Sequence, residues 1–118
     1  MAVVEDSAVF LRRVESLLQE IPDVLLVGTA EDVAGAKLLL GETQADVLLL
    51  DLYLKEGSGL DVLRYVREAE LPTSVLVMTS EPSDEIRTVC LSLGALDCVD
   101  KALLPDAVYG TIQAAARD

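Results

Sequence analysis

The feature that most constrains the fold is an uninterrupted apolar run, residues 47–50, that ends on the carboxylate of Asp51. Four consecutive aliphatic residues without polar alternation are typical of a strand covered on both faces, as in a parallel sheet flanked by helices. Ligands of such sheets bind beyond the carboxyl ends of the strands. We therefore expect Asp51 at the edge where chemistry occurs, although a lone aspartate at a strand end more often caps a helix.

The rest of the chain repeats one unit, a short apolar run followed by residues at helical spacing. The runs predict strands over residues 2–4, 24–27, 47–51, 75–78 and 97–100. Apolar positions after each run predict five amphipathic helices, with faces that carry Phe10 to Ile21, Val33 to Leu40, Leu60 to Val66, Ile86 to Leu93 and Val108 to Ala115. This alternation predicts an α/β fold, a parallel sheet with helices on both faces and right-handed crossovers.

Composition narrows the class of protein. We expect one domain over residues 1–118, a length that supports a single core. The formal net charge of -12 disfavours direct nucleic-acid contact by this segment. No apolar run approaches the roughly 20 residues of a membrane span, and the start lacks the basic residues of a signal peptide, so we expect a cytoplasmic protein without membrane contact. Because the chain has no histidine, zinc hydrolysis and acyl transfer are excluded, and Cys90 and Cys98 are expected to be reduced thiols.

A second apolar run, residues 2–4, also ends on carboxylates, those of Glu5 and Asp6. If the two strands are parallel neighbours, their ends place Glu5, Asp6 and Asp51 around one spot, where like charges repel unless a cation neutralises them. A site made only of oxygen ligands and rich in carboxylates suits Mg²⁺ or Mn²⁺. The sequence therefore predicts a divalent-cation site at this edge.

Polar residues follow two more of the predicted strands, Thr79 after residues 75–78 and Lys101 after residues 97–100. Acids that bind a metal ion, an acid able to act as nucleophile, a hydroxyl and a lysine form a set suited to phosphoryl transfer onto a carboxylate. The metal ion and the lysine offset charge on the phosphoryl oxygens, and the hydroxyl donates to another oxygen. The expected product is an aspartyl phosphate on Asp51.

With these motifs in view, the chain resembles the receiver domain of two-component response regulators, nearly from end to end. In that family an acidic pair after the first strand binds Mg²⁺, which Glu5 and Asp6 match. The aspartate that ends the third strand accepts phosphate, which Asp51 matches. Thr79 matches the switch hydroxyl of the family, and Lys101 matches its lysine.

The resemblance implies further features. The fold would be flavodoxin-like, a (βα)5 three-layer sandwich with strand order 2-1-3-4-5. Residues 94–101 are similar to the family's Gly-Ala-x-x-aromatic-x-x-Lys segment, which puts Cys98 at the aromatic switch position. The backbone carbonyl of Tyr53 falls where a metal ligand is expected.

The function implied is a switch activated by phosphorylation, in which a partner's phosphohistidine donates its phosphoryl group to Asp51. The donor would be a sensor histidine kinase or a histidine phosphotransfer protein, since this chain has no histidine. Such a domain catalyses its own phosphorylation and dephosphorylation rather than acting as a conventional turnover enzyme. The resemblance is compatible with a receiver that belongs to a longer transcriptional regulator, and with a homodimer that forms on phosphorylation.

A receiver-like adaptor that binds partners without being phosphorylated is the alternative function. The family usually has proline where this chain has Lys55 and Ala102 and an aromatic residue where it has Cys98, which supports the adaptor, whereas the complete set of site residues argues against it. A flavin-binding electron carrier is disfavoured by the acids after the first strand and by the aromatic content of 3%. A phosphatase of the haloacid dehalogenase type would need a second acid where Tyr53 stands.

Overall fold

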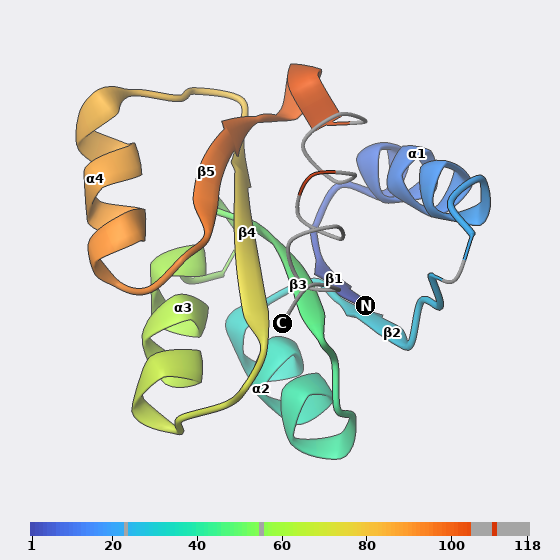
Figure 1. The fold of residues 1–118 in the computed structure, drawn as a ribbon, viewed down its shortest axis with the longest axis horizontal. Helices are drawn as coiled ribbons and strands as arrows, with labels where there is room; N and C mark the ends of the chain where they lie inside the picture. Colours follow the sequence, from blue (N-terminus) through green and yellow to red (C-terminus); the bar gives the residue numbers. More distant parts are fainter. Residues whose placement is uncertain (23, 55, 105–109, 111–118) are drawn as a thin grey trace.

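The structure is a computed structural model that describes residues 1–22, 24–54, 56–104 and 110. Its centre is a five-stranded parallel sheet in the order β2-β1-β3-β4-β5, as expected (Figure 1). The strands are β1 (Ala2–Val4), β2 (Gly28–Ala30), β3 (Val47–Asp51), β4 (Ser74–Thr79) and β5 (Asp97–Asp100). Every paired strand runs parallel to its neighbour.

Helices cover both faces of this sheet, which confirms the three-layer arrangement. They are α1 (Ala8–Gln19), α2 (Val33–Glu42), α3 (Gly59–Glu68) and α4 (Asp84–Ser92), followed by a short 3₁₀ turn, η1 (Lys101–Leu103). Figure 1 shows α1 on one side of the sheet and α3 and α4 on the other. Among the described helices, none has the length and apolar character needed to cross a membrane. The helix predicted after Pro105 falls almost wholly outside the described residues.

The central strands supply the core because each of their side chains is covered by one helical layer. All residues of β3 are buried. Leu48 and Leu50 pack with α2, α3 and α4, whereas Leu49, which points to the opposite face, packs with Val14 and Leu18 of α1. Both faces of β3 are therefore apolar, which explains the absence of polar alternation in its sequence.

The prediction of a strand over residues 24–27 is wrong, because β2 begins at Gly28. In the structure Leu25 is 74% exposed and Val27 is 39% exposed. The ladder pairs Ala2 with Gly28 and Val4 with Ala30, so the earlier residues lie beyond the start of β1, where Met1 bonds to the backbone of Leu25 and Val27. A Cβ atom at Gly28 would overlap Leu39 of α2, so glycine allows this helix to pack closely on the edge strand.

The apolar face predicted for α4 is wrong at one position. Cys90 is fully buried and Ile86 is partly buried, but Val89 is 42% exposed. Only a narrow stripe of α4 contacts the sheet, and Val89 lies on the flank of that stripe. The helix ends before Gly94, which adopts a positive φ of 99° directly after the cap residue Leu93.

Candidate functional site

The carboxyl ends of the strands meet at one edge of the sheet, the upper edge in Figure 1. The register pairs Val4 with Leu50, so the residues that follow them, Glu5 and Asp51, leave neighbouring strands together. β4 and β5 end beside them, with Thr79 paired to Asp100. Parallel pairing thus brings the predicted site residues from distant parts of the sequence to one place.

Three carboxylates form the centre of this edge. Glu5, Asp6 and Asp51 each offer an oxygen atom, and these atoms all lie within 4.8 Å of one another. Glu5 is 1% exposed and Asp51 is 4% exposed, whereas Asp6 is partly exposed. Backbone N–H groups orient the two buried acids: Ser7 donates to Oε1 of Glu5 at 3.1 Å, and Tyr53 donates to Oδ1 of Asp51 at 3.3 Å.

Lys101 supplies the positive charge of the site. Its Nζ lies 2.9 Å from Oε2 of Glu5 and 3.3 Å from Oδ2 of Asp51, so one ammonium group bridges two buried carboxylates. The same Nζ lies 4.4 Å from the centre of the Phe10 ring, which covers it with an aromatic face. One lysine does not balance three acids, so the site keeps a net negative charge.

The donor set fits a hard divalent cation. The buried Oε2 of Glu5 has no hydrogen-bond donor among the described residues, although it is ion-paired with Lys101. A carboxylate oxygen has more than one lone pair, so this oxygen can bind a cation in addition to its contact with Lys101. Glu5, Asp6 and Asp51 are therefore the residues able to hold Mg²⁺ or Mn²⁺.

The electrostatics of the site act most strongly on Asp51. Burial, together with the negative charge of Glu5, raises the pKa of this carboxyl group from 3.8 to about 6, although Lys101 and the Tyr53 N–H oppose the increase. Removal from water and a like charge both disfavour the ionised form. A cation placed between the acids would favour the carboxylate, which is the nucleophilic form.

Thr79 ends β4 and is fully buried. Its Oγ1 accepts a hydrogen bond of 3.0 Å from the backbone N–H of Glu81, which ties the hydroxyl to the loop that leads into α4. Because a hydroxyl can accept and donate at the same time, its proton remains available to an oxygen bound beside Asp51.

Tyr53 and Cys98 differ in their relation to the site. Tyr53 contacts Asp51 through its backbone, and its ring is exposed. Cys98 is buried in the apolar core with Cys90 of α4 rather than among the carboxylates. Burial, with a smaller contribution from Cys90, raises the pKa of the Cys98 thiol to about 12, and burial also raises the pKa of the Cys90 thiol, so both cysteines remain protonated.

Sequence reasoning missed two residues that shape the site. Phe10, the only phenylalanine, was assigned simply to an apolar helix face, but it also covers Lys101. The second is Gly59, where a Cβ atom would overlap the carbonyl oxygen of Asp51 and lie 2.9 Å from Cα of Leu52. The start of α3 therefore packs directly on the end of β3, and the glycine at position 59 is the one signal in the sequence that indicates this contact.

Comparison with known proteins points to one family. The model of the response regulator receiver domain matches residues 1–113. The chain is 33% identical over 106 residues to protein-glutamate methylesterase/protein-glutamine glutaminase 3 of Shewanella oneidensis, covering 88% of this chain and 30% of the relative. It is 27% identical over 115 residues to the transcriptional regulatory protein YdfI of Bacillus subtilis, covering 98% of this chain and 54% of that protein. The chain therefore spans only part of the relatives it matches.

Solved structures agree with this family. The receiver domain of the putative response regulator NarL from Mycobacterium tuberculosis superposes with a TM-score of 0.89 at 30% identity, covering 98% of this chain and 94% of that one. The response regulator domain of Thermotoga maritima CheB gives a TM-score of 0.84 at 26% identity, covering 99% and 96%.

Proposed function

Because the chain belongs to the response regulator receiver domain family, we propose that it is a phosphorylation-dependent switch in two-component signalling, with Asp51 as the phosphoacceptor. The observation that carries this proposal is the position of Asp51, a buried carboxylate that shares the ammonium group of Lys101 with Glu5. We take the whole chain, residues 1–118, as this one domain, acting in the cytoplasm.

The proposed reaction transfers a phosphoryl group between two nucleophiles. An Oδ atom of Asp51 forms a bond to phosphorus while the bond from phosphorus to the imidazole nitrogen of the donor breaks, and the electron pair leaves with the imidazole. The donor is a phosphohistidine of a sensor kinase or of a histidine phosphotransfer protein. Acetyl phosphate serves as a chemical substitute, with acetate as the leaving group.

Each site residue has a role that follows from its position. Lys101 pairs with a phosphoryl oxygen, and the hydroxyl of Thr79 donates to another once the group is bound. Glu5 and Asp6, with Asp51 and the carbonyl of Tyr53, would hold Mg²⁺ or Mn²⁺. When bound, this ion offsets the repulsion between the carboxylates and the incoming phosphoryl oxygens.

The relatives indicate that this domain is joined to different effector activities in different proteins. The matched part is a minor portion of a methylesterase in one relative and about half of a transcriptional regulator in another. A common receiver joined to different effector activities is expected if phosphorylation changes a surface that other proteins or domains recognise. We propose that this surface includes the loop after Thr79 and α4, because the hydroxyl of Thr79 holds that loop.

Phosphate uptake tests the proposal. Incubation of the protein with acetyl phosphate and Mg²⁺ should increase its intact mass by one phosphate, whereas Asp51→Asn should gain none. Asp61→Asn is the matched control, since Asp61 is an exposed acid on α3, and it should gain phosphate like the parent. If the parent gains no phosphate although it is folded, the adaptor function is favoured instead.

A further inference from the structure

A small apolar groove lies next to the candidate phosphorylation site, between the β3–α3 connection and α4. Leu52, Tyr53 and Leu60 form one wall, and Ile86 and Val89 form the other, with Glu85 at the side. The cavity measures about 260 Å³. This space accepts one apolar side chain rather than a whole structural element.

Two of the residues that line the groove have large apolar or aromatic side chains that are exposed to solvent. Tyr53 is 53% exposed, and Val89 is 42% exposed although its spacing on α4 predicted burial. Single exposed apolar residues are normal, but residues of this kind that gather around a concavity mark a binding site. The groove therefore has the character of an unoccupied interface.

Both walls of the groove are linked to the site. The backbone N–H of Tyr53 donates to Asp51, so a change at that carboxylate acts directly on one wall. The other wall, α4, follows the loop held by the hydroxyl of Thr79. If Asp51 is phosphorylated as proposed, the groove is among the surfaces that respond first.

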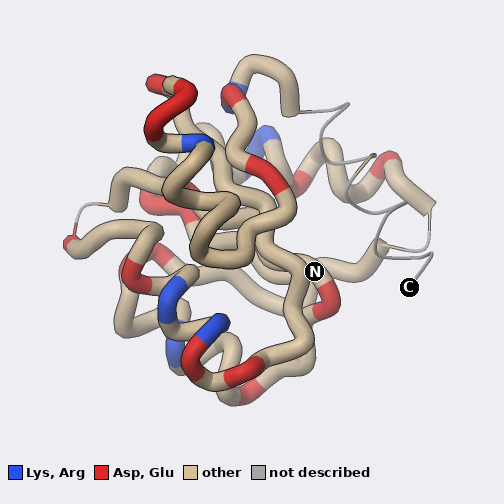
Figure 2. Tube along the Cα trace, turned by 60° about the vertical axis from the view of Figure 1, so that its left-hand side comes forward, with Lys and Arg blue, Asp and Glu red and all other residues tan. Residues whose placement is uncertain are grey.

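Charge indicates what the groove would bind. Glu85 lines the groove, and two more acids, Glu81 and Asp84, lie around the start of α4; all three are exposed. Figure 2 shows the start of α4 as a red acidic stretch at the upper left. The nearest base on α4, Arg87, is already paired with Asp97 at 2.9 Å. A partner of positive charge is complementary to this rim.

We propose that the groove binds an apolar side chain presented by a Lys/Arg-rich segment of a partner protein. The apolar lining supplies the anchor pocket, and the acids at the rim attract the flanking bases. This inference deepens the proposed function by naming the chemistry of a partner, and its coupling to phosphorylation rests on that function. The binding itself requires no phosphate.

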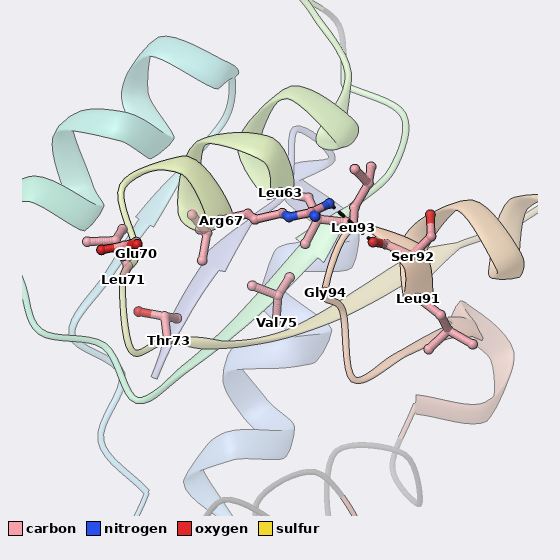
Figure 3. A pocket seen from close by; sticks show the side chains of 11 residues that line it. Leu63, Arg67, Glu70, Leu71, Thr73, Val75, Leu91, Ser92, Leu93 and Gly94 are labelled. Atoms are coloured by element: carbon pink, nitrogen blue, oxygen red, sulfur yellow. Dashed lines mark hydrogen bonds between the residues drawn. The ribbon is translucent and has the colours of Figure 1, made fainter.

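A larger cavity lies at the opposite end of the sheet and provides a control. It measures about 430 Å³ and is lined by the ends of α3 and α4, where Arg67 donates to the carbonyl oxygen of Ser92 at 3.3 Å (Figure 3). Glu70 offsets the charge of Arg67, so this cavity favours neither sign. Leu91 lines it and is 42% exposed, the same fraction as Val89 on the same helix.

A peptide titration tests the proposal. The probe is a synthetic peptide of about 12 residues with one leucine flanked by lysines, added to ¹⁵N-labelled protein without phosphate or metal. Amide shifts should concentrate at the groove residues, and Val89→Ser should weaken binding about tenfold, equivalent to about 1.4 kcal/mol. Leu91→Ser should leave the affinity unchanged. A peptide with glutamates in place of the lysines should bind at least about tenfold more weakly.

Other results would overturn the proposal. Shifts that concentrate on α1, equal losses in Val89→Ser and Leu91→Ser, or equal affinity for the two peptides would each show that the groove is not the site. A second variant, Tyr53→Ala, removes the other wall and should give the same loss as Val89→Ser. Because the titration needs no phosphorylation, a failure of phosphate uptake would refute the proposed function and leave this result unaffected.

Discussion

Replacement of Asp51 by asparagine should stabilise the metal-free protein above neutral pH, because the carboxylate is ionised in a buried site beside Glu5. The folded protein raises the pKa of Asp51 from 3.8 to about 6. Between these two values the folded chain retains a proton that the unfolded chain has lost, so stability falls as pH rises through this window. Above the window the full cost of ionising the folded site is present.

The size of the effect follows from the two pKa values. At about 1.4 kcal/mol per pH unit, the difference corresponds to roughly 3 kcal/mol, with the favourable contact to Lys101 already included. Asparagine imitates the neutral acid in shape and charge. Asp51→Asn should therefore match the parent below pH 4 and exceed its stability by up to roughly 3 kcal/mol at pH 8.

Urea unfolding in EDTA at pH 4 to 8, followed by circular dichroism, measures this difference. Asp61→Asn, a change at an exposed acid paired with Arg64, is the control and should differ from the parent by less than about 0.5 kcal/mol at each pH. A parent that is more stable than Asp51→Asn at pH 8, or a difference that does not change with pH, would refute the electrostatic reasoning.

Three further predictions follow from the site. Millimolar Mg²⁺ should raise the melting temperature of the parent by binding the native state, and Asp6→Ala should lose this effect; a parent indifferent to Mg²⁺ would contradict it. Gly59→Ala should cost about 2 kcal/mol or more in urea unfolding, because its Cβ atom has no space against the backbone of Asp51; an unchanged midpoint would show that α3 can shift. Beryllofluoride, which imitates a phosphoryl group on Asp51, should change the amide chemical shifts of residues 79–93 more than those of residues 98–101, because Thr79 holds the loop before α4 whereas Cys98 is small and buried. Equal chemical-shift changes would show that β5 takes part in the conformational change.

The sequence predicted the central strands because their apolar runs are covered on both faces and allow no other placement. The sequence-based prediction was wrong at the edge strand, because residues 24–27 are more apolar than the Gly-Thr-Ala segment that forms β2. Which residues form β2 depends on which of them lie beside β1, not on their hydrophobicity. Because β1 has only three residues, only Gly28 to Ala30 pair with it, and the periodicity of the sequence does not show this.

The acid cluster and its lysine were predictable for the same reason that the sheet was, since Asp51 ends one strand and Glu5 and Lys101 directly follow two others. The contact of Phe10 with Lys101 was not, because it joins a helix face to a strand end across the sheet edge. Val89 shows a related limit of helical spacing. A period of 3.6 residues marks an apolar face, but it does not say whether the sheet or a partner covers the edge of that face.

The location of the phosphoryl group tests the central claim most directly. Borohydride reduces an aspartyl phosphate to homoserine, which peptide mass spectrometry can assign to one position in the chain. After treatment with acetyl phosphate and Mg²⁺, we expect homoserine at position 51 alone, and none when EDTA replaces Mg²⁺. Homoserine at position 6 or 61 instead, or undiminished labelling in Asp51→Asn, would contradict the account.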